Sequence, residues 1–200
     1  MNQPQTQMPI KTSDQTQPQT APSFSLAAFA PGWGATVMGT GVVSVIFSAL
    51  ARNEFLPSIM EPASLIMLVV TILLAAVVLT LTTMRWIRHF DMVQGELRHP
   101  ILGAMHVTFG GALLVPAIAL GRAGESVLPP SALVPLIYVL TAVGSIITLG
   151  VGWVFLTDIF RRGDVQAGLI TGAWFIPPVL AIVIPLALSP TIRAGSAVSR

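Results

Sequence analysis

Hydrophobic residues gather along the chain into five long stretches that contain no Asp, Glu, Lys or Arg, and the charges lie in the segments between them. Each stretch is close to the roughly 20 apolar residues that a helix needs to cross the hydrocarbon core of a bilayer. A helix at the surface of a soluble core is apolar on one face, whereas these stretches are apolar all round. The pattern predicts an all-α integral membrane protein with a transmembrane domain at 24–188, whose spans are 31–51, 63–84, 101–120, 132–156 and 169–188.

The composition favours the same class. Hydrophobic residues make up 54% of the chain and charged residues 9%, whereas soluble domains carry about 25% charged residues. The chain therefore fits a lipid bilayer as its surroundings. The ten Lys and Arg are scattered and form no stripe, which argues against a nucleic-acid partner. The absence of cysteine excludes disulfides and thiolate chemistry.

The segment before the first span differs from the rest of the chain. Residues 1–23 are rich in Gln, Thr and Pro, and such a segment buries too little apolar surface to offset its conformational entropy. It lacks the ordered basic, apolar and cleavage regions of a secretory signal. We expect a disordered cytoplasmic tail.

The loop charges predict an orientation, because Lys and Arg accumulate on the cytoplasmic side of short loops. Six lie on the side of the N-terminus: Lys11, Arg85, Arg88, Arg98, Arg161 and Arg162. Two lie on the opposite side, Arg52 and Arg122. We expect a multi-pass protein of the cell membrane, plasma or inner, with a cytoplasmic N-terminus and residues 189–200 outside as a C-terminal tail.

Glycine and proline distinguish the odd-numbered spans. The first, third and fifth spans contain repeated Gly or Pro, and the second contains neither. Broken helices at membrane depth are tolerated where they are buried in protein or line a water-filled cavity. The pattern favours odd spans that line a substrate pathway and even spans that face lipid, although small residues also serve close helix packing.

Three stretches resemble a known family. The first span opens with FAPGWGATVMGTGVVS at residues 29–44, the third with RHPI at 98–101, and the fifth contains ITGAWFIPP at 170–178. These stretches are similar, in order and spacing, to the first, third and fifth helices of the tellurite-resistance/dicarboxylate transporter family. That family includes tellurite-resistance channels, plant slow anion channels, malate permeases and sulfite efflux pumps.

The resemblance implies a fold of ten helices with cytoplasmic termini, in which five helical hairpins surround a pore lined by odd-numbered helices in a pseudo-five-fold arrangement. It also implies a homo-oligomer, a trimer. The chain corresponds to the N-terminal half of that fold, so residues 189–200 are interpreted as a truncation point, and such a fragment is not expected to conduct by itself. The family's gating phenylalanine lies on the ninth helix and cannot be assigned here.

The candidate pathway residues lie on the odd spans: Gly34, Gly39, Thr40, Gly41, His106, Gly110, Thr171, Phe175 and Pro178. His106 is the ionisable side chain within a predicted span, and it could bind a proton, donate to an anion, or stay neutral near the interface. Phe175 could narrow the pathway or pack. The hydroxyls of Thr40 and Thr171 could meet an anion or bond their own helix backbone.

Enzymatic functions find little support in the sequence. No phosphate-binding loop is present, and the three histidines lack the spacing of a metal site. We therefore expect a non-enzyme without cofactor or metal. The leading hypothesis is transport of small anions, C4-dicarboxylates or inorganic oxyanions. The alternatives are dedicated sulfite or tellurite efflux, and a non-transporting membrane scaffold or truncated product.

Overall fold

The computed structural model describes residues 25–163 and 171–198 and is helical throughout, with no strand in those two ranges. The predicted disordered tail at 1–23 lies outside them. The elements in order are η1 (Leu26–Ala28), η2 (Pro31–Trp33), α1 (Gly34–Arg52), α2 (Pro57–Arg88), α3 (Phe90–Leu97), α4 (Leu102–His106), α5 (Thr108–Ala123), η3 (Gly124–Ser126), α6 (Pro130–Arg162), η5 (Gly172–Phe175) and α7 (Ile176–Val198).

Five stretches are long and apolar enough to span a membrane, which confirms the predicted number of spans among the described residues. They are Pro31–Arg52, Pro57–Arg88, Leu102–Ser126, Pro130–Arg162 and Gly172–Ser189. The first two residues of the predicted fifth span, 169 and 170, are not described.

The helices extend beyond the predicted limits at several ends. Helix α2 has 32 residues and α6 has 33, lengths of about 48–50 Å at 1.5 Å per residue. A bilayer core is only about 30 Å thick, so both helices project beyond it. Helix α7 likewise continues to Val198, past the predicted end at 188. Charged residues ended the predicted spans, but backbone hydrogen bonding does not stop at a charge.

The prolines of the fifth span interrupt it less than its sequence suggests. Pro177 and Pro178 fall in the first turn of α7, which begins at Ile176. The first N–H groups of a helix have no partner within that helix, so proline costs little there. The third span, in contrast, divides at Val107 into the short α4 and the longer α5.

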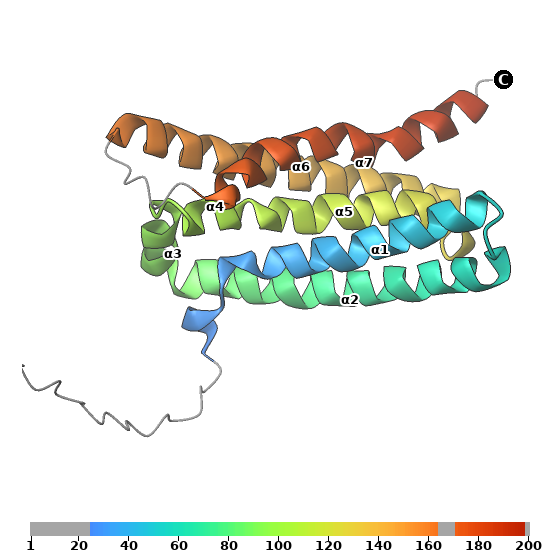
Figure 1. Ribbon diagram of the computed structural model, residues 1–200, viewed down its shortest axis with the longest axis horizontal. Helices are drawn as coiled ribbons and strands as arrows, with labels where there is room; N and C mark the ends of the chain where they lie inside the picture. The colour runs from blue at the N-terminus through green and yellow to red at the C-terminus, as the bar shows by residue number, and fades with distance from the viewer. Residues whose placement is uncertain (1–24, 164–170, 199–200) are drawn as a thin grey trace, which may run out of the picture.

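The odd-numbered spans lie next to one another. Helix α5 contacts α1 on one side and α7 on the other, while α2 and α6 also pack against it (Figure 1). The apolar window of the third span is 78% buried, against 17–28% in the other four. The described chain therefore forms a row of α1, α5 and α7 with α5 at its centre.

Small polar residues join the first two spans. The Ser44 hydroxyl donates to the Ser64 carbonyl at 2.9 Å, and the Ser64 hydroxyl donates back to the Ser44 carbonyl at 3.0 Å. Both serines are buried. This reciprocal pair fixes α1 against α2 where lipid could satisfy neither hydroxyl.

Candidate functional site

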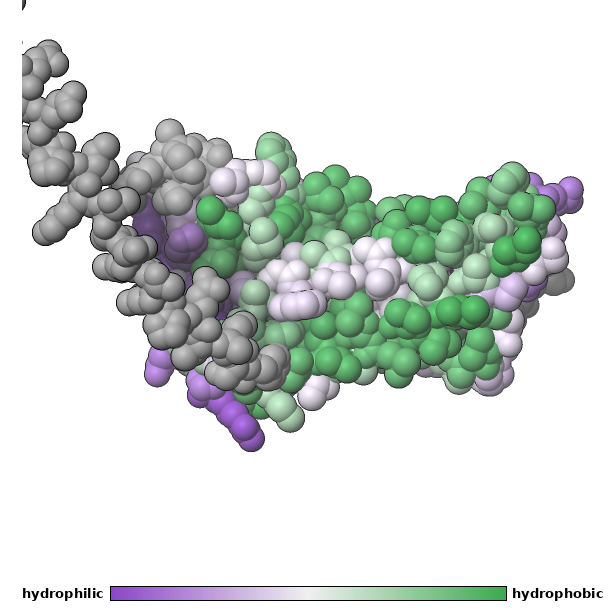
Figure 2. Space-filling view, turned by 60° about the horizontal axis from the view of Figure 1, so that its bottom comes forward, coloured by the Kyte–Doolittle hydropathy of each residue, from purple (hydrophilic) through white to green (hydrophobic). Residues whose placement is uncertain are grey.

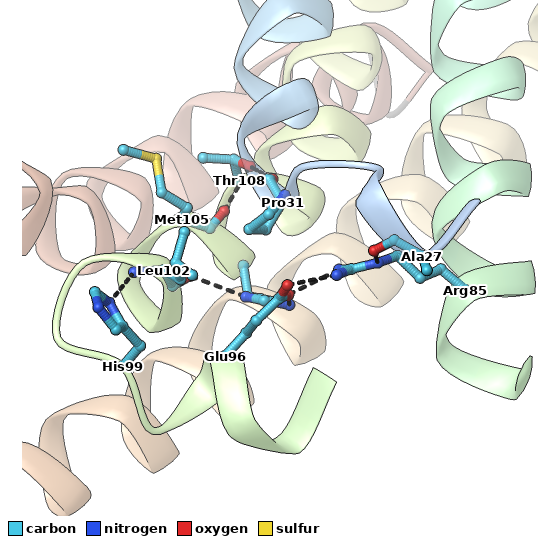
Figure 3. Close-up of polar contacts among 9 residues, drawn as sticks. Ala27, Pro31, Arg85, Glu96, His99, Leu102, Met105 and Thr108 are labelled. Atoms are coloured by element: carbon cyan, nitrogen blue, oxygen red, sulfur yellow. Dashed lines mark hydrogen bonds and ion pairs between the residues drawn. The ribbon is translucent and has the colours of Figure 1, made fainter. Parts of the chain in front are cut away.

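A buried ion pair lies at the end of the bundle where α2 finishes. Arg85, in the last turn of α2, is only 4% exposed. Its Nη1 donates to Glu96 Oε2 at 2.8 Å and its Nη2 to Glu96 Oε1, so the pair is bidentate. Its Nε donates to the Ala27 carbonyl of η1 at 3.1 Å (Figure 3). All three donor nitrogens are thus engaged within the protein.

His106 extends this ion pair into the third span. It is the last residue of α4 and is completely buried. Its Nδ1 lies 2.9 Å from the Leu102 carbonyl oxygen and its Nε2 lies 3.5 Å from Glu96 Oε2. The Trp86 and Phe109 rings meet the imidazole edge to face at centroid distances of 6.1 and 6.0 Å. We refer to Arg85, Glu96 and His106 as the ionic cluster.

Thr108 connects the ionic cluster to the start of the first span. Its hydroxyl lies 3.1 Å from the Pro31 carbonyl and 2.7 Å from the Met105 carbonyl, and it donates to these acceptors (Figure 3). A Cβ added at Gly34 would lie 2.6 Å from the Thr108 carbonyl oxygen. The absence of a side chain at Gly34 therefore lets α1 approach the beginning of α5.

Sequence reasoning missed Glu96 and used Arg85 only to predict the orientation in the membrane. Each of the three guanidinium nitrogens of Arg85 instead donates one hydrogen bond, to Glu96 or Ala27. A signal was present in α2, whose buried residues recur at intervals of three and four: Ser64, Leu68, Thr71, Ala75, Val78, Thr82 and Arg85. Arg85 continues this inward-facing stripe, so its burial follows from helical spacing once the buried face of α2 is known. No comparable pattern marks Glu96.

Three of the candidate glycines lie in tight helix contacts. A Cβ at Gly110 would meet Thr148 and would lie 2.8 Å from the Gly144 carbonyl oxygen of α6. At Gly41 a Cβ would lie 2.6 Å from a methyl group of Val115. Gly34 belongs to the same group through its contact with α5. These positions bring helices together.

Gly39 differs from those three, because a Cβ there would meet nothing within 4 Å. It lies on a part of α1 that also exposes Thr36. On the surface, a strip of near-neutral hydropathy runs lengthwise between two hydrophobic ridges (Figure 2). Gly39 is the candidate glycine with open space beside it.

The remaining candidates are not gathered into one site. The Thr40 hydroxyl donates within its own helix, to the carbonyls of Val37 at 3.0 Å and Thr36 at 3.2 Å. Phe175 is 70% exposed and Pro178 is exposed. Thr171 is half-buried, and its hydroxyl has no hydrogen-bond partner in the described part of the chain.

A pocket of about 390 Å³ opens at the other end of the bundle, between α1, α2 and the end of α5. Arg52 and Arg122 line it together with Glu61 and Glu125, so it offers no excess of positive charge to an anion. Arg52 donates to the Arg122 carbonyl at 2.7 Å. Among the described residues, no group of three or more His, Asp or Glu side chains is placed to hold a metal ion.

Comparisons with known proteins point to one family. Residues 28–199 match the sequence profile of the voltage-dependent anion channel family. The chain is 31% identical over 159 residues to an uncharacterized transporter of Methanocaldococcus jannaschii, and the match covers 80% of this chain and 44% of that protein. A second uncharacterized transporter of the same organism is 28% identical over 165 residues, with 80% and 43% covered. The chain thus spans less than half the length of these relatives. No solved structure matches it.

Proposed function

Because the chain belongs to the voltage-dependent anion channel family, we propose that it takes part in the passage of small anions across a membrane, along a pathway lined by the odd-numbered spans. The observation that carries this proposal is the row formed by α1, α5 and α7, with α2 and α6 packed against it. In this arrangement α5 lies between α1 and α7, so the three odd spans are neighbours, as the lining of a common pathway requires.

The chemistry of the spans suits conduction better than tight capture. An unpaired ion in hydrocarbon is very costly, so a passing anion needs water, backbone N–H groups or cationic side chains. Arg85 is already paired with Glu96 and does not serve as a binding cation. Within the described spans, water beside small residues such as Gly39 is the compensation that we propose.

The finer proposals follow the sequence and the family. The substrates are C4-dicarboxylates or inorganic oxyanions, with dedicated sulfite or tellurite efflux as the alternative, and the assembly is a homo-oligomer. The protein lies in the cell membrane with a cytoplasmic N-terminus, as the distribution of loop Lys and Arg suggests.

Reporter fusions after Arg122 and Arg162 test the orientation. An external signal at Arg162 with a cytoplasmic signal at Arg122 would reverse it.

Flux through proteoliposomes tests the function, in a ten-helix protein of the family fold that contains this chain. Gly39→Leu is expected to reduce efflux of chloride, sulfite or malate, because leucine would fill open space beside the pathway. The matched control is Gly150→Leu, since Gly150 lies on the even-numbered α6 and a Cβ there also meets nothing within 4 Å. Equal flux in the two variants at equal abundance would contradict a pathway beside Gly39. Because this chain is not expected to conduct by itself, absence of anion flux from an unsubstituted protein that contains all ten helices of the family fold would contradict the function itself.

A further inference from the structure

The two ring nitrogens of His106 both lie near oxygen atoms, so the protonation state of the ring decides which of these contacts can be hydrogen bonds. Nδ1 lies 2.9 Å from the Leu102 carbonyl oxygen, which can only accept a hydrogen bond. Nε2 lies 3.5 Å from Glu96 Oε2 and has no hydrogen-bond partner among the described residues. The carboxylate is held by Arg85 through both oxygens, so it too presents an acceptor.

A neutral imidazole carries one N–H and cannot satisfy both contacts. With the proton on Nδ1, the Nε2 lone pair faces a carboxylate oxygen. With the proton on Nε2, the Nδ1 lone pair faces the carbonyl of Leu102. Only the doubly protonated imidazolium donates to both oxygens, and its Nε2–H would then make a charge-assisted contact to Glu96.

We propose that His106 Nε2 and Glu96 form a buried proton-binding site at the α4–α5 junction, with Arg85 fixing the carboxylate. The charged groups that face the imidazole are Glu96 from α3 and Arg85 from α2. Trp86 from α2 and Phe109 from α5 contribute aromatic rings. Arg85 and Glu96 cancel one another, so the bound proton would give the cluster one net positive charge, which burial opposes and the carboxylate favours.

Glu96 also offers a route for the proton. His106 is completely buried, whereas the Glu96 side chain is 18% exposed. A proton delivered by hydronium would form an O–H bond on Glu96 and leave water behind. That O–H bond would then break as the Nε2–H bond forms, which restores the carboxylate. His106 lies two residues before Thr108, which binds Pro31 of the first span. If the proposed anion passage holds, occupancy of this site makes that passage pH dependent.

Nitrogen-15 NMR of labelled histidine tests the site without reference to transport. Spectra of the purified chain in nanodiscs are recorded from about pH 5.5 to 7.5, a range that brackets the ordinary histidine value. The expected result is a resonance, absent from His106→Gln, whose Nδ1 stays protonated while Nε2 gains a proton on acidification. An Nε2 that stays protonated, or stays unprotonated, across the whole pH range would overturn the proposal.

Glu96→Gln sharpens the test, because it removes the negative charge that favours the doubly protonated ring. The Nε2 transition should be lost in this variant, and the pH dependence of anion flux should be lost in both His106→Gln and Glu96→Gln. His89→Gln is the control and should keep both. An Nε2 transition together with no anion flux from a ten-helix protein that contains this chain supports the proton site and refutes the proposed function. A pH-dependent anion flux without the Nε2 transition refutes the proton site and supports the proposed function.

Discussion

Arg85→Ala is expected to lower the free energy of unfolding by about 3–5 kcal/mol, the usual cost of removing one partner of a buried ion pair. The reason is that Glu96 would keep its charge in a mostly buried position after losing both guanidinium contacts. The η1 carbonyl of Ala27 would lose its donor as well. Denaturation by SDS in mixed micelles, followed by circular dichroism, measures the loss.

A second ion pair provides the control. Arg162 and Asp158 form a 2.7 Å pair on α6, but their side chains are 41% and 31% exposed. Arg162→Ala should therefore cost only about 0–1 kcal/mol. The double variant Arg85→Met, Glu96→Met should lose less stability than the sum of the single variants, since it leaves no unpaired charge. A loss below about 1 kcal/mol for Arg85→Ala would contradict a buried, functioning pair.

Gly110→Ala is expected to destabilise the chain by about 1–3 kcal/mol or more, because overpacked sites force backbone shifts. The added Cβ would lie 2.8 Å from both the Gly144 carbonyl oxygen and the Thr148 backbone nitrogen. Backbone atoms cannot rotate away, so α5 and α6 would have to separate. The same SDS denaturation measures the change.

Gly150→Ala should behave in the opposite way. Its Cβ would meet nothing within 4 Å, and alanine stabilises a helix interior by about 0.5–1 kcal/mol relative to glycine. Similar effects at the two positions would mean that the α5–α6 contact is loose. A stability loss at Gly110 would also explain reduced transport there without any role in lining a pathway, which is why Gly39 serves the transport test.

The sequence predicted the spans well because length and hydropathy are local properties. Five apolar stretches were sufficient to place five helices. The helix ends were predicted less well, since α2 and α6 continue through their terminal arginines. Hydropathy reports what the bilayer accepts, whereas a helix ends where its backbone hydrogen bonds end.

The site was only partly accessible to sequence reasoning. A glycine that packs against a helix and a glycine that lines a pathway look the same in a sequence. Only the atoms around each position distinguish Gly110, which is tightly packed, from Gly39, which has open space beside it. His106 stood out as an ionisable group within an apolar span. Its partner Glu96 did not, because it lies eleven positions after Arg85, in a different helix.

The central claim, an anion pathway along the odd-numbered spans, is tested most directly by the reactivity of introduced cysteines. The chain contains no cysteine, so Gly39→Cys and Gly150→Cys each give a protein with one thiol and no background. Water-soluble methanethiosulfonates of negative and positive charge are applied to membranes that contain either variant. The thiol at position 39 should react, and faster with the anionic reagent, while that at position 150 should be protected by lipid. Equal reactivity at the two positions, or a preference for the cationic reagent at position 39, would contradict the proposed pathway.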